Sequence, residues 1–134
     1  MKRTTKVLVA MLVVLFLSAA PALATLPLIV GTSAGEQIMG TSNAERILGL
    51  GGSDEISDGL GRDLVYGGMG ANNHIGYGGD TSLDRFYGGQ GNDIFQPRDV
   101  PAVKDVVSCG AGTDTVYADK ADVVRDDCER VKAW

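Results

Sequence analysis

The stretch that decides the fold runs from Gly31 to Tyr66 and reads GTSAGEQIM, GTSNAERIL, GLGGSDEIS and DGLGRDLVY when it is divided every nine residues. The four units align without a gap. In each unit the sixth residue is an acid and the eighth is aliphatic. Self-similarity at a short fixed period is typical of a solenoid, in which each repeat forms one structural unit.

The pattern continues beyond Tyr66 with less regular spacing. Further complete or partial units occupy residues 67–77, 78–87, 88–96, 105–108, 109–117 and 122–124. The units 67–77 and 78–87 each carry an insertion of one or two residues, and a spacer with Pro97 and Pro101 precedes residue 105. The repeat therefore covers most of the chain after residue 30.

Each position of the repeat has a physical role. Glycine at the first, second and fourth positions permits the positive φ angles and close backbone approach of a tight turn. The last three residues suit a very short strand with one apolar side chain pointing inward. Stacked units can bury that side chain, although one unit alone cannot. The predicted core consists of Ile38, Ile47, Ile56, Val65, Ile75, Phe86 and Phe95. Because no stretch has helical apolar spacing, we expect an all-β solenoid.

The composition changes at residue 24 of the 134-residue chain. The first 24 residues contain three basic residues, no acid and no glycine, and an apolar run extends from Val7 to Leu17. A small-residue end, PALA at 21–24, completes the anatomy of a secretory signal peptide. The alternative, a retained membrane anchor, is disfavoured because a run of about 11 residues is too short to span the bilayer. We therefore predict a signal peptide at 1–24, one domain at 25–134 and a secreted, extracellular protein without a membrane span.

The predicted mature chain is acidic and rich in glycine. Its 110 residues include 9 basic and 17 acidic side chains, which give a net charge of −8. An acidic surface repels phosphate backbones, which disfavours nucleic acid as a partner. Glycine makes up 17% of these residues, against about 7% in ordinary proteins. Such a chain is either disordered or built from a repeating turn.

The acidic sixth position indicates a cation. If two units make one coil, carboxylates stack about 5 Å apart and repel by about 0.8 kcal/mol in water and about 3 kcal/mol at an effective dielectric of 20. A hard cation between coils reverses the sign of this interaction, and carboxylate and carbonyl oxygens favour Ca²⁺ over Mg²⁺. The alternative is a metal-free solenoid with a solvated acidic edge. An EF-hand loop starting at Asp54 is excluded because Ile56 and Val65 stand where ligands are needed.

The repeat resembles the hemolysin-type (RTX) calcium-binding nonapeptide, with the pattern Gly-Gly-x-Gly-x-Asp-x-apolar-x. Gly88–Gln96 matches it fully, Asp58–Tyr66 and Cys109–Tyr117 match except at the first residue, and Gly49–Ser57 departs at the second. The resemblance implies a parallel β-roll that binds several Ca²⁺ ions between turns, through the sixth-position Asp of neighbouring coils and backbone oxygens.

Carried onto this chain, the resemblance implies a set of metal ligands. The strongest side-chain candidates are Asp54, Asp63, Asp84, Asp93 and Asp114, followed by Asp105. Asn73 occupies the ligand position of an irregular unit and offers an uncharged oxygen. Glu36 and Glu45 are one methylene longer than the motif requires, so calcium at the amino-terminal end is a weaker expectation.

Two cysteines, Cys109 and Cys128, lie near the carboxyl terminus. In an exported protein they can form a disulfide, and closing a loop of this length stabilises a fold by about 3 kcal/mol. The alternative, a metal or redox site, lacks Cys-x-x-Cys spacing and a nearby histidine. We expect a disulfide that, together with Trp134, closes the carboxyl-terminal edge of the roll.

The sequence does not predict an enzyme. His74, the single histidine, lies in an inserted stretch without an acid or nucleophile at motif spacing, and we expect it to be a solvated loop residue. A secreted calcium-binding module that folds on Ca²⁺ is the leading hypothesis. The alternative is a calcium-dependent adhesion module that uses a stripe of exposed tyrosines, namely Tyr66, Tyr77, Tyr87 and Tyr117, although packing along the strand flank explains these residues better.

Overall fold

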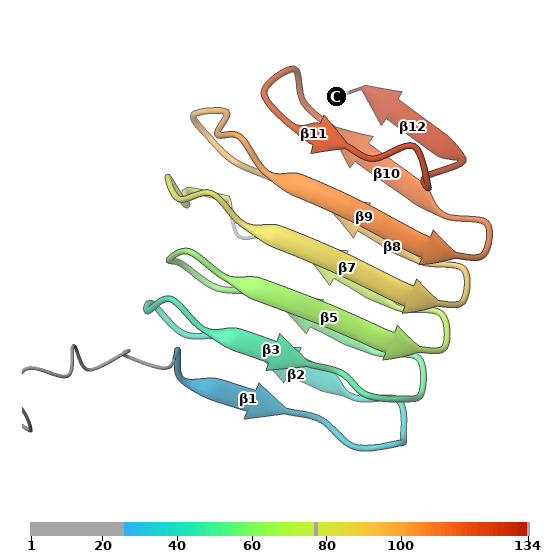
Figure 1. Ribbon diagram of the computed structural model, residues 1–134. Coiled ribbons are helices and arrows are strands. Elements are labelled where there is room, and N and C mark those ends of the chain that lie inside the picture. Colours follow the sequence, from blue (N-terminus) through green and yellow to red (C-terminus); the bar gives the residue numbers. More distant parts are fainter. Residues whose placement is uncertain (1–25, 77, 134) are drawn as a thin grey trace, which may run out of the picture.

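Two parallel β-sheets lie face to face and are wound by one chain into a flattened coil (Figure 1). The computed structural model describes residues 26–76 and 78–133. The predicted signal peptide at 1–24, Tyr77 and the predicted cap residue Trp134 lie outside these ranges. Among the described residues, no helix is long and apolar enough to cross a membrane.

The strands are short and alternate between the two sheets along the chain. Sheet A consists of β1 (Leu28–Val30), β3 (Arg46–Leu48), β5 (Leu64–Met69), β7 (Arg85–Gln90), β9 (Val106–Ala111) and β11 (Val123–Val124) in this order. Sheet B consists of β2 (Gln37–Met39), β4 (Glu55–Ser57), β6 (Asn73–Ile75), β8 (Ile94–Gln96), β10 (Thr115–Ala118) and β12 (Arg130–Ala133).

Two consecutive repeats form one coil. Every strand pairs in parallel with the strand two positions along the chain, so that Ile47 lies beside Val65 in sheet A and Gln37 lies beside Glu55 in sheet B. Equivalent residues of successive coils are therefore stacked. This arrangement confirms the predicted all-β parallel β-roll.

The core is one side chain thick on each side. The central residue of most strands points between the sheets and is buried. The predicted core residues Ile38, Ile47, Ile56, Val65, Phe86 and Phe95 are among them, and Val107 and Val116 extend the core. The flanking residues of each strand point outward and are more exposed. Because this apolar core is thin, its burial stabilises the fold only to a limited extent. Interactions in the turns can therefore contribute to the stability of the roll.

The core prediction was wrong at one coil. His74, not Ile75, occupies the inward position of β6, where it is 1% exposed and stacks on Phe95 with ring centroids 4.6 Å apart. Burial lowers the pKa of His74 to about 3. The imidazole is therefore a neutral aromatic member of the core and not the solvated loop residue that we expected.

The turns require glycine where the backbones of successive coils meet. Gly70 has φ +105°, and a Cβ atom there would lie 2.0 Å from the carbonyl oxygen of Gly52 in the coil below. Any side chain at this position would displace the backbone of the neighbouring coil. The glycine column thus sets the close stacking of the turns.

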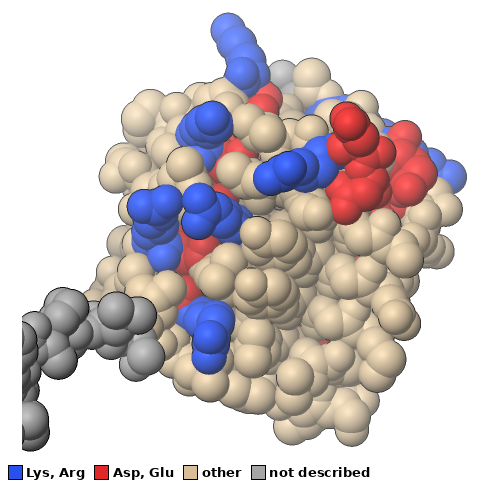
Figure 2. Space-filling model, in the orientation of Figure 1, with Lys and Arg blue, Asp and Glu red and all other residues tan. Residues whose placement is uncertain are grey.

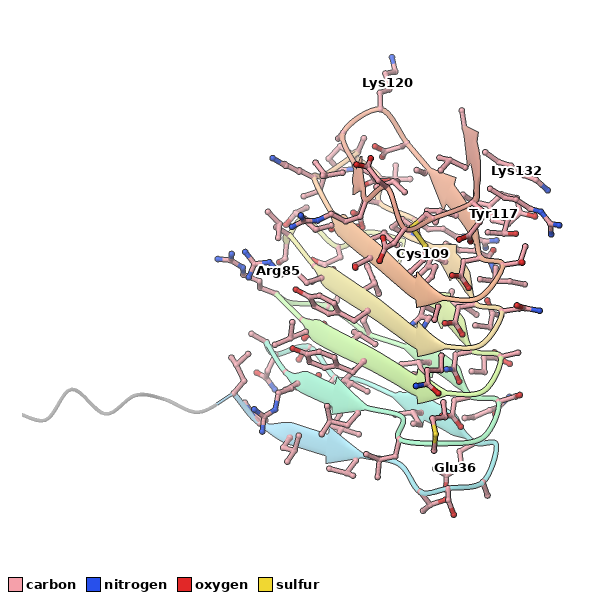
Figure 3. The ribbon with its side chains drawn as sticks, turned by 45° about the vertical axis from the view of Figure 1, so that its right-hand side comes forward. Glu36, Arg85, Cys109, Tyr117, Lys120 and Lys132 are labelled. Atoms are coloured by element: carbon pink, nitrogen blue, oxygen red, sulfur yellow. A yellow bond between two sulfur atoms is a disulfide. The ribbon has the colours of Figure 1, made fainter. Side chains whose placement is uncertain are left out.

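The predicted disulfide joins Cys109 and Cys128 with a Cα–Cα distance of 5.2 Å. Cys109 belongs to β9 and is fully buried, and Cys128 lies just before β12, the last strand of sheet B. Figure 3 shows Cys109 near the carboxyl-terminal end of the roll. The bond therefore fastens the final coil to the coil that it covers.

Candidate metal-binding edges

The roll has two edges, where the chain crosses between the sheets. At the regular edge, the turns that lead from sheet A to sheet B carry one polar residue per coil at the sixth position: Glu36, Asp54, Asn72, Asp93, Asp114 and Glu129. At the extended edge, the turns that lead back to sheet A carry Glu45, Asp63, Asp84, Asp105 and Asp122. We call each of these sets the acid column of its edge.

Hydrogen bonds hold both columns in vertical register. One side-chain oxygen accepts a hydrogen bond from the backbone N–H of the column residue in the preceding coil. At the regular edge these distances are 2.6–2.9 Å, from Glu36 N to Asp54 up to Asp114 N to Glu129. At the extended edge they are 2.7–3.2 Å, from Glu45 N to Asp63 up to Asp105 N to Asp122.

The other carboxylate oxygen is the notable atom. Oδ2 is buried and accepts no hydrogen bond from any described residue in four of the predicted ligands: Asp54, Asp63, Asp93 and Asp114. A buried carboxylate oxygen without a donor is costly. These oxygens are hard, anionic donors that recur once per coil, so the residues fit a hard cation such as Ca²⁺.

Burial and mutual repulsion perturb the columns strongly. Burial, with added repulsion from neighbouring carboxylates, raises the pKa of Asp63 and Asp84 to about 7 and that of Asp93 to about 6. For the same reasons the pKa of Asp105 rises to about 9. Without a compensating positive charge, these carboxylates cannot all be ionised near neutral pH.

Glu36 and Glu45, the weaker ligand candidates, are hydrogen-bonded within their own turns. Both Glu36 oxygens accept hydrogen bonds from its own turn, from Thr32 N at 2.7 Å and Thr32 Oγ1 at 2.9 Å. Both Glu45 oxygens are bonded in the same way by Thr41 N and Thr41 Oγ1. The extra methylene lets each glutamate reach back, so its oxygens are already paired. Glu36 lies in the first turn of the roll (Figure 3).

Asn73, the predicted ligand of its unit, lies one residue after the position that faces the acid column. Asn72 occupies the column, is 2% exposed and accepts a hydrogen bond from Asp54 N, whereas Asn73 Oδ1 accepts a hydrogen bond from Gln96 on the outer face of sheet B. The reason is that the segment 67–72, which includes the last residues of β5, has the regular length of six residues, and the inserted residues follow β6 instead. The correct register pairs Asn72 with His74 as sixth and eighth residues.

Sequence reasoning missed several acids of the edges. Glu129 closes the regular column, and the spacing of Glu129 to Val131, sixth to eighth, could have revealed it. Asp80, Asp99 and Asp119 lie in turns of the extended edge, outside the sixth position. No repeat-based signal could have identified these three residues.

The side chains alone do not complete a metal site. Among the described residues, no three His, Cys, Asp or Glu side chains converge in a group that could hold a metal ion. A cation between coils would therefore take one or two carboxylates from the columns and its remaining oxygens from turn carbonyls and water. Ca²⁺ accepts six to eight oxygen ligands in flexible geometry, which suits such a mixed set.

Comparison with known families supports this assignment. The sequence profile of the RTX calcium-binding nonapeptide repeat matches residues 39–73 and 79–96 in four copies. These residues include Glu45, Asp54, Asp63, Asp84 and Asp93 of the two acid columns. Neither a curated protein nor a solved structure matches the chain significantly.

Proposed function

We propose that this chain, which carries repeats of the RTX calcium-binding nonapeptide family, is a secreted calcium-binding β-roll that folds around Ca²⁺. One observation carries the proposal. In four buried column aspartates, one carboxylate oxygen accepts a hydrogen bond from the backbone of the neighbouring coil and the other, Oδ2, has no donor: Asp54, Asp63, Asp93 and Asp114. The repeat family and the β-roll fold both suggest calcium binding.

The proposed link between binding and folding follows from charge. In the acid columns, carboxylates of successive coils lie above one another. Their mutual repulsion opposes folding, and the core that must offset it is only one side chain thick. The ligands come together only when the coils stack, so the free energy of calcium binding is also folding free energy. We expect several ions, because unpartnered oxygens occur at both edges.

Far-UV circular dichroism of residues 25–134 tests this proposal. In calcium-free buffer we expect a largely unfolded spectrum, and addition of Ca²⁺ should produce a β-rich one, whereas Mg²⁺ at the same concentration should be much less effective. Chelation of the calcium should reverse the change. A β spectrum that is identical with and without calcium would refute calcium-dependent folding.

Secretion is supported by the leader-like sequence at 1–24 and by the disulfide between Cys109 and Cys128, which fits an oxidising compartment. Expression of the full chain followed by amino-terminal sequencing of the exported protein tests this part. We expect the mature protein to begin at Thr25.

We propose a binding role rather than a catalytic one. The single histidine, His74, is 1% exposed and packed between aromatic rings. A substrate at the surface cannot reach it. Calcium is therefore the ligand for which the described residues provide a recurring arrangement.

An adhesion role is supported by one aromatic pair. Tyr66 and Tyr87 stack on the outer face of sheet A, with ring centroids 4.9 Å apart, and Tyr66 is 37% exposed. Tyr117 does not extend this pair, because it lies on sheet B beside Lys132 (Figure 3). Replacement of Tyr66 and Tyr87 by serine should abolish calcium-dependent binding to cells or surfaces if the pair is an adhesion site, and should leave calcium binding intact.

A further inference from the structure

The turn 76–84 at the extended edge carries a buried aspartate, Asp80, that the nonapeptide pattern does not contain. Asp80 is 4% exposed. Its Oδ1 accepts hydrogen bonds from Thr81 N at 2.6 Å and Ser82 N at 2.9 Å, which fixes the carboxylate in the turn. Its Oδ2 is buried and receives no hydrogen bond from any described residue. An oriented, desolvated oxygen of this kind is costly unless a cation binds it.

A second aspartate with the same property comes from the neighbouring turn. Turn 97–105 has nine residues, as turn 76–84 does, whereas turn 58–63 has six. Asp99 in this turn also has a buried Oδ2 without a donor among the described residues, and its carboxyl group interacts with that of Asp105 in the acid column. Asp80 and Asp99 repel one another, and Asp80 also acts on Asp63 and Asp84 of the acid column. The longer turns thus add a second row of carboxylates beside the column.

We propose that Asp80 and Asp99 bind a Ca²⁺ ion that joins the two nine-residue turns, in addition to the ions held by the acid columns. The inference rests on the proposed function in that the same cation is expected, but the site lies outside the repeat motif. Backbone oxygens of the two turns and water would complete the ligand set. The donors are all oxygen, and two carboxylates match the charge of a hard divalent cation.

A hollow beside Asp99 brings solvent to the turn 97–105. It has a volume of about 400 Å³ and is lined by Pro97, Arg98, Asp99, Val100 and Asp119. In Figure 2 acidic side chains are visible between Lys and Arg side chains at the side of the molecule where the strands of sheet A begin. The proposed site thus has solvent at its Asp99 side, and water can fill coordination positions that the protein leaves open.

The test is the number of calcium ions bound per chain, measured by equilibrium dialysis with elemental analysis. Asp80→Asn retains one side-chain oxygen, which can still accept the Thr81 and Ser82 hydrogen bonds, while the other oxygen becomes an NH₂ group and the negative charge is removed. We expect this variant to bind one calcium ion fewer than the wild type while its circular dichroism in calcium is unchanged. Glu55→Gln is the matched control, because Glu55 is exposed on β4 and makes the same change in charge.

Asp99→Asn should cause the same loss as Asp80→Asn, and this variant decides the matter if Asp80→Asn does not fold. An unchanged ion count and affinity in the folded variant would overturn the additional site and leave the proposed function standing. An equal loss in Glu55→Gln would also overturn it, because the effect would then be one of net charge. A wild-type chain that binds no calcium would instead refute the proposed function itself.

Discussion

At the acid columns the carboxylates of the first coil and those of the later coils bond different parts of the molecule. The glutamates Glu36 and Glu45 turn back to a threonine of their own turn. The column residues of the later coils bond the backbone of the preceding coil, as Asp63 does with Glu45 N and Glu129 does with Asp114 N. The amino-terminal turns are thereby satisfied without a cation, whereas the later turns are not.

This difference predicts unequal roles in calcium binding. Asp93→Asn removes a carboxylate with an unpartnered, buried Oδ2, and we expect calcium affinity to fall by about tenfold or more. Glu36→Gln alters a carboxylate that Thr32 already pairs, and affinity should stay within about twofold. Calcium titration followed by isothermal calorimetry measures both. Equal losses in the two variants would contradict the distinction.

His74 offers a prediction on stability. Neither ring nitrogen has a hydrogen-bond partner among the described residues, and the ring is fully buried. We expect His74→Leu, which is of similar size and apolar, to raise the free energy of unfolding by about 1 kcal/mol or more. Urea unfolding at saturating calcium is the measurement.

Phe95→Leu is the control, because it introduces the same side chain next to His74 without removing a polar group. This variant should lower the free energy of unfolding, since it removes buried apolar volume. A loss of stability in His74→Leu would show that the ring nitrogens make a bond that the variant breaks, and the interpretation of His74 would then be wrong.

At the scale of elements, the sequence specified most strands but not the register of one coil. The spacing of acid and apolar residues placed β2, β3, β4, β5, β8 and β10 correctly. In 67–87 the consecutive residues Asn72 and Asn73, followed by His74 and Ile75, satisfy the pattern in two registers one residue apart. A slip of one residue exchanges the two faces of a strand. The stacking of His74 on Phe95 selects the observed register.

The disulfide acts on the last elements of the roll. Closing a loop of this length restricts the unfolded chain, and the double variant Cys109→Ala with Cys128→Ala should lose about 3 kcal/mol of stability. Urea unfolding in saturating calcium measures the loss. Reduction of the wild type should cause a similar shift, and an unchanged unfolding midpoint in both cases would contradict a stabilising role.

At the scale of the whole molecule, the acid columns predict how pH acts on the calcium-free protein. Burial raises the pKa of Asp63 and Asp84 from the ordinary 3.8 to about 7 in the folded state, so folding favours the protonated form. The resulting stabilisation is fully present below pH 3.8 and is lost as the pH rises through about 7. Protonation of these carboxyl groups thus removes part of the repulsion that a bound cation would otherwise neutralise.

Thermal unfolding at several pH values measures this effect. In calcium-free buffer the folded fraction, and the melting temperature where a transition is seen, should be higher at about pH 5 than at about pH 8, where the chain is expected to be largely unfolded, and saturating calcium at pH 8 should remove the difference. The variant with Asp63→Asn and Asp84→Asn should depend less on pH. A calcium-free melting temperature that increases from pH 5 to pH 8 would contradict the prediction.

The candidate site could be predicted in its regular part alone. The sixth-position aspartates were identified because stacking repeats them at equal intervals, so that Asp54, Asp63 and Asp93 share one environment. Asp80 and Asp99 could not be found in this way. Their positions depend on the backbone path of two longer turns. These turns do not follow the nonapeptide repeat, so the sequence pattern does not predict their path.

The stacked architecture also has a mechanical consequence. Each strand bonds only the strands of the coils directly above and below it, β1 and β2 form the free end, and the Cys109–Cys128 bond fastens the opposite end. A pulling force on residues 26 and 133 therefore loads the coils in series. Under tension the coils are expected to unwind in steps from the two outer strands, β1 and β12, while the loop between Cys109 and Cys128 stays closed by its covalent bond.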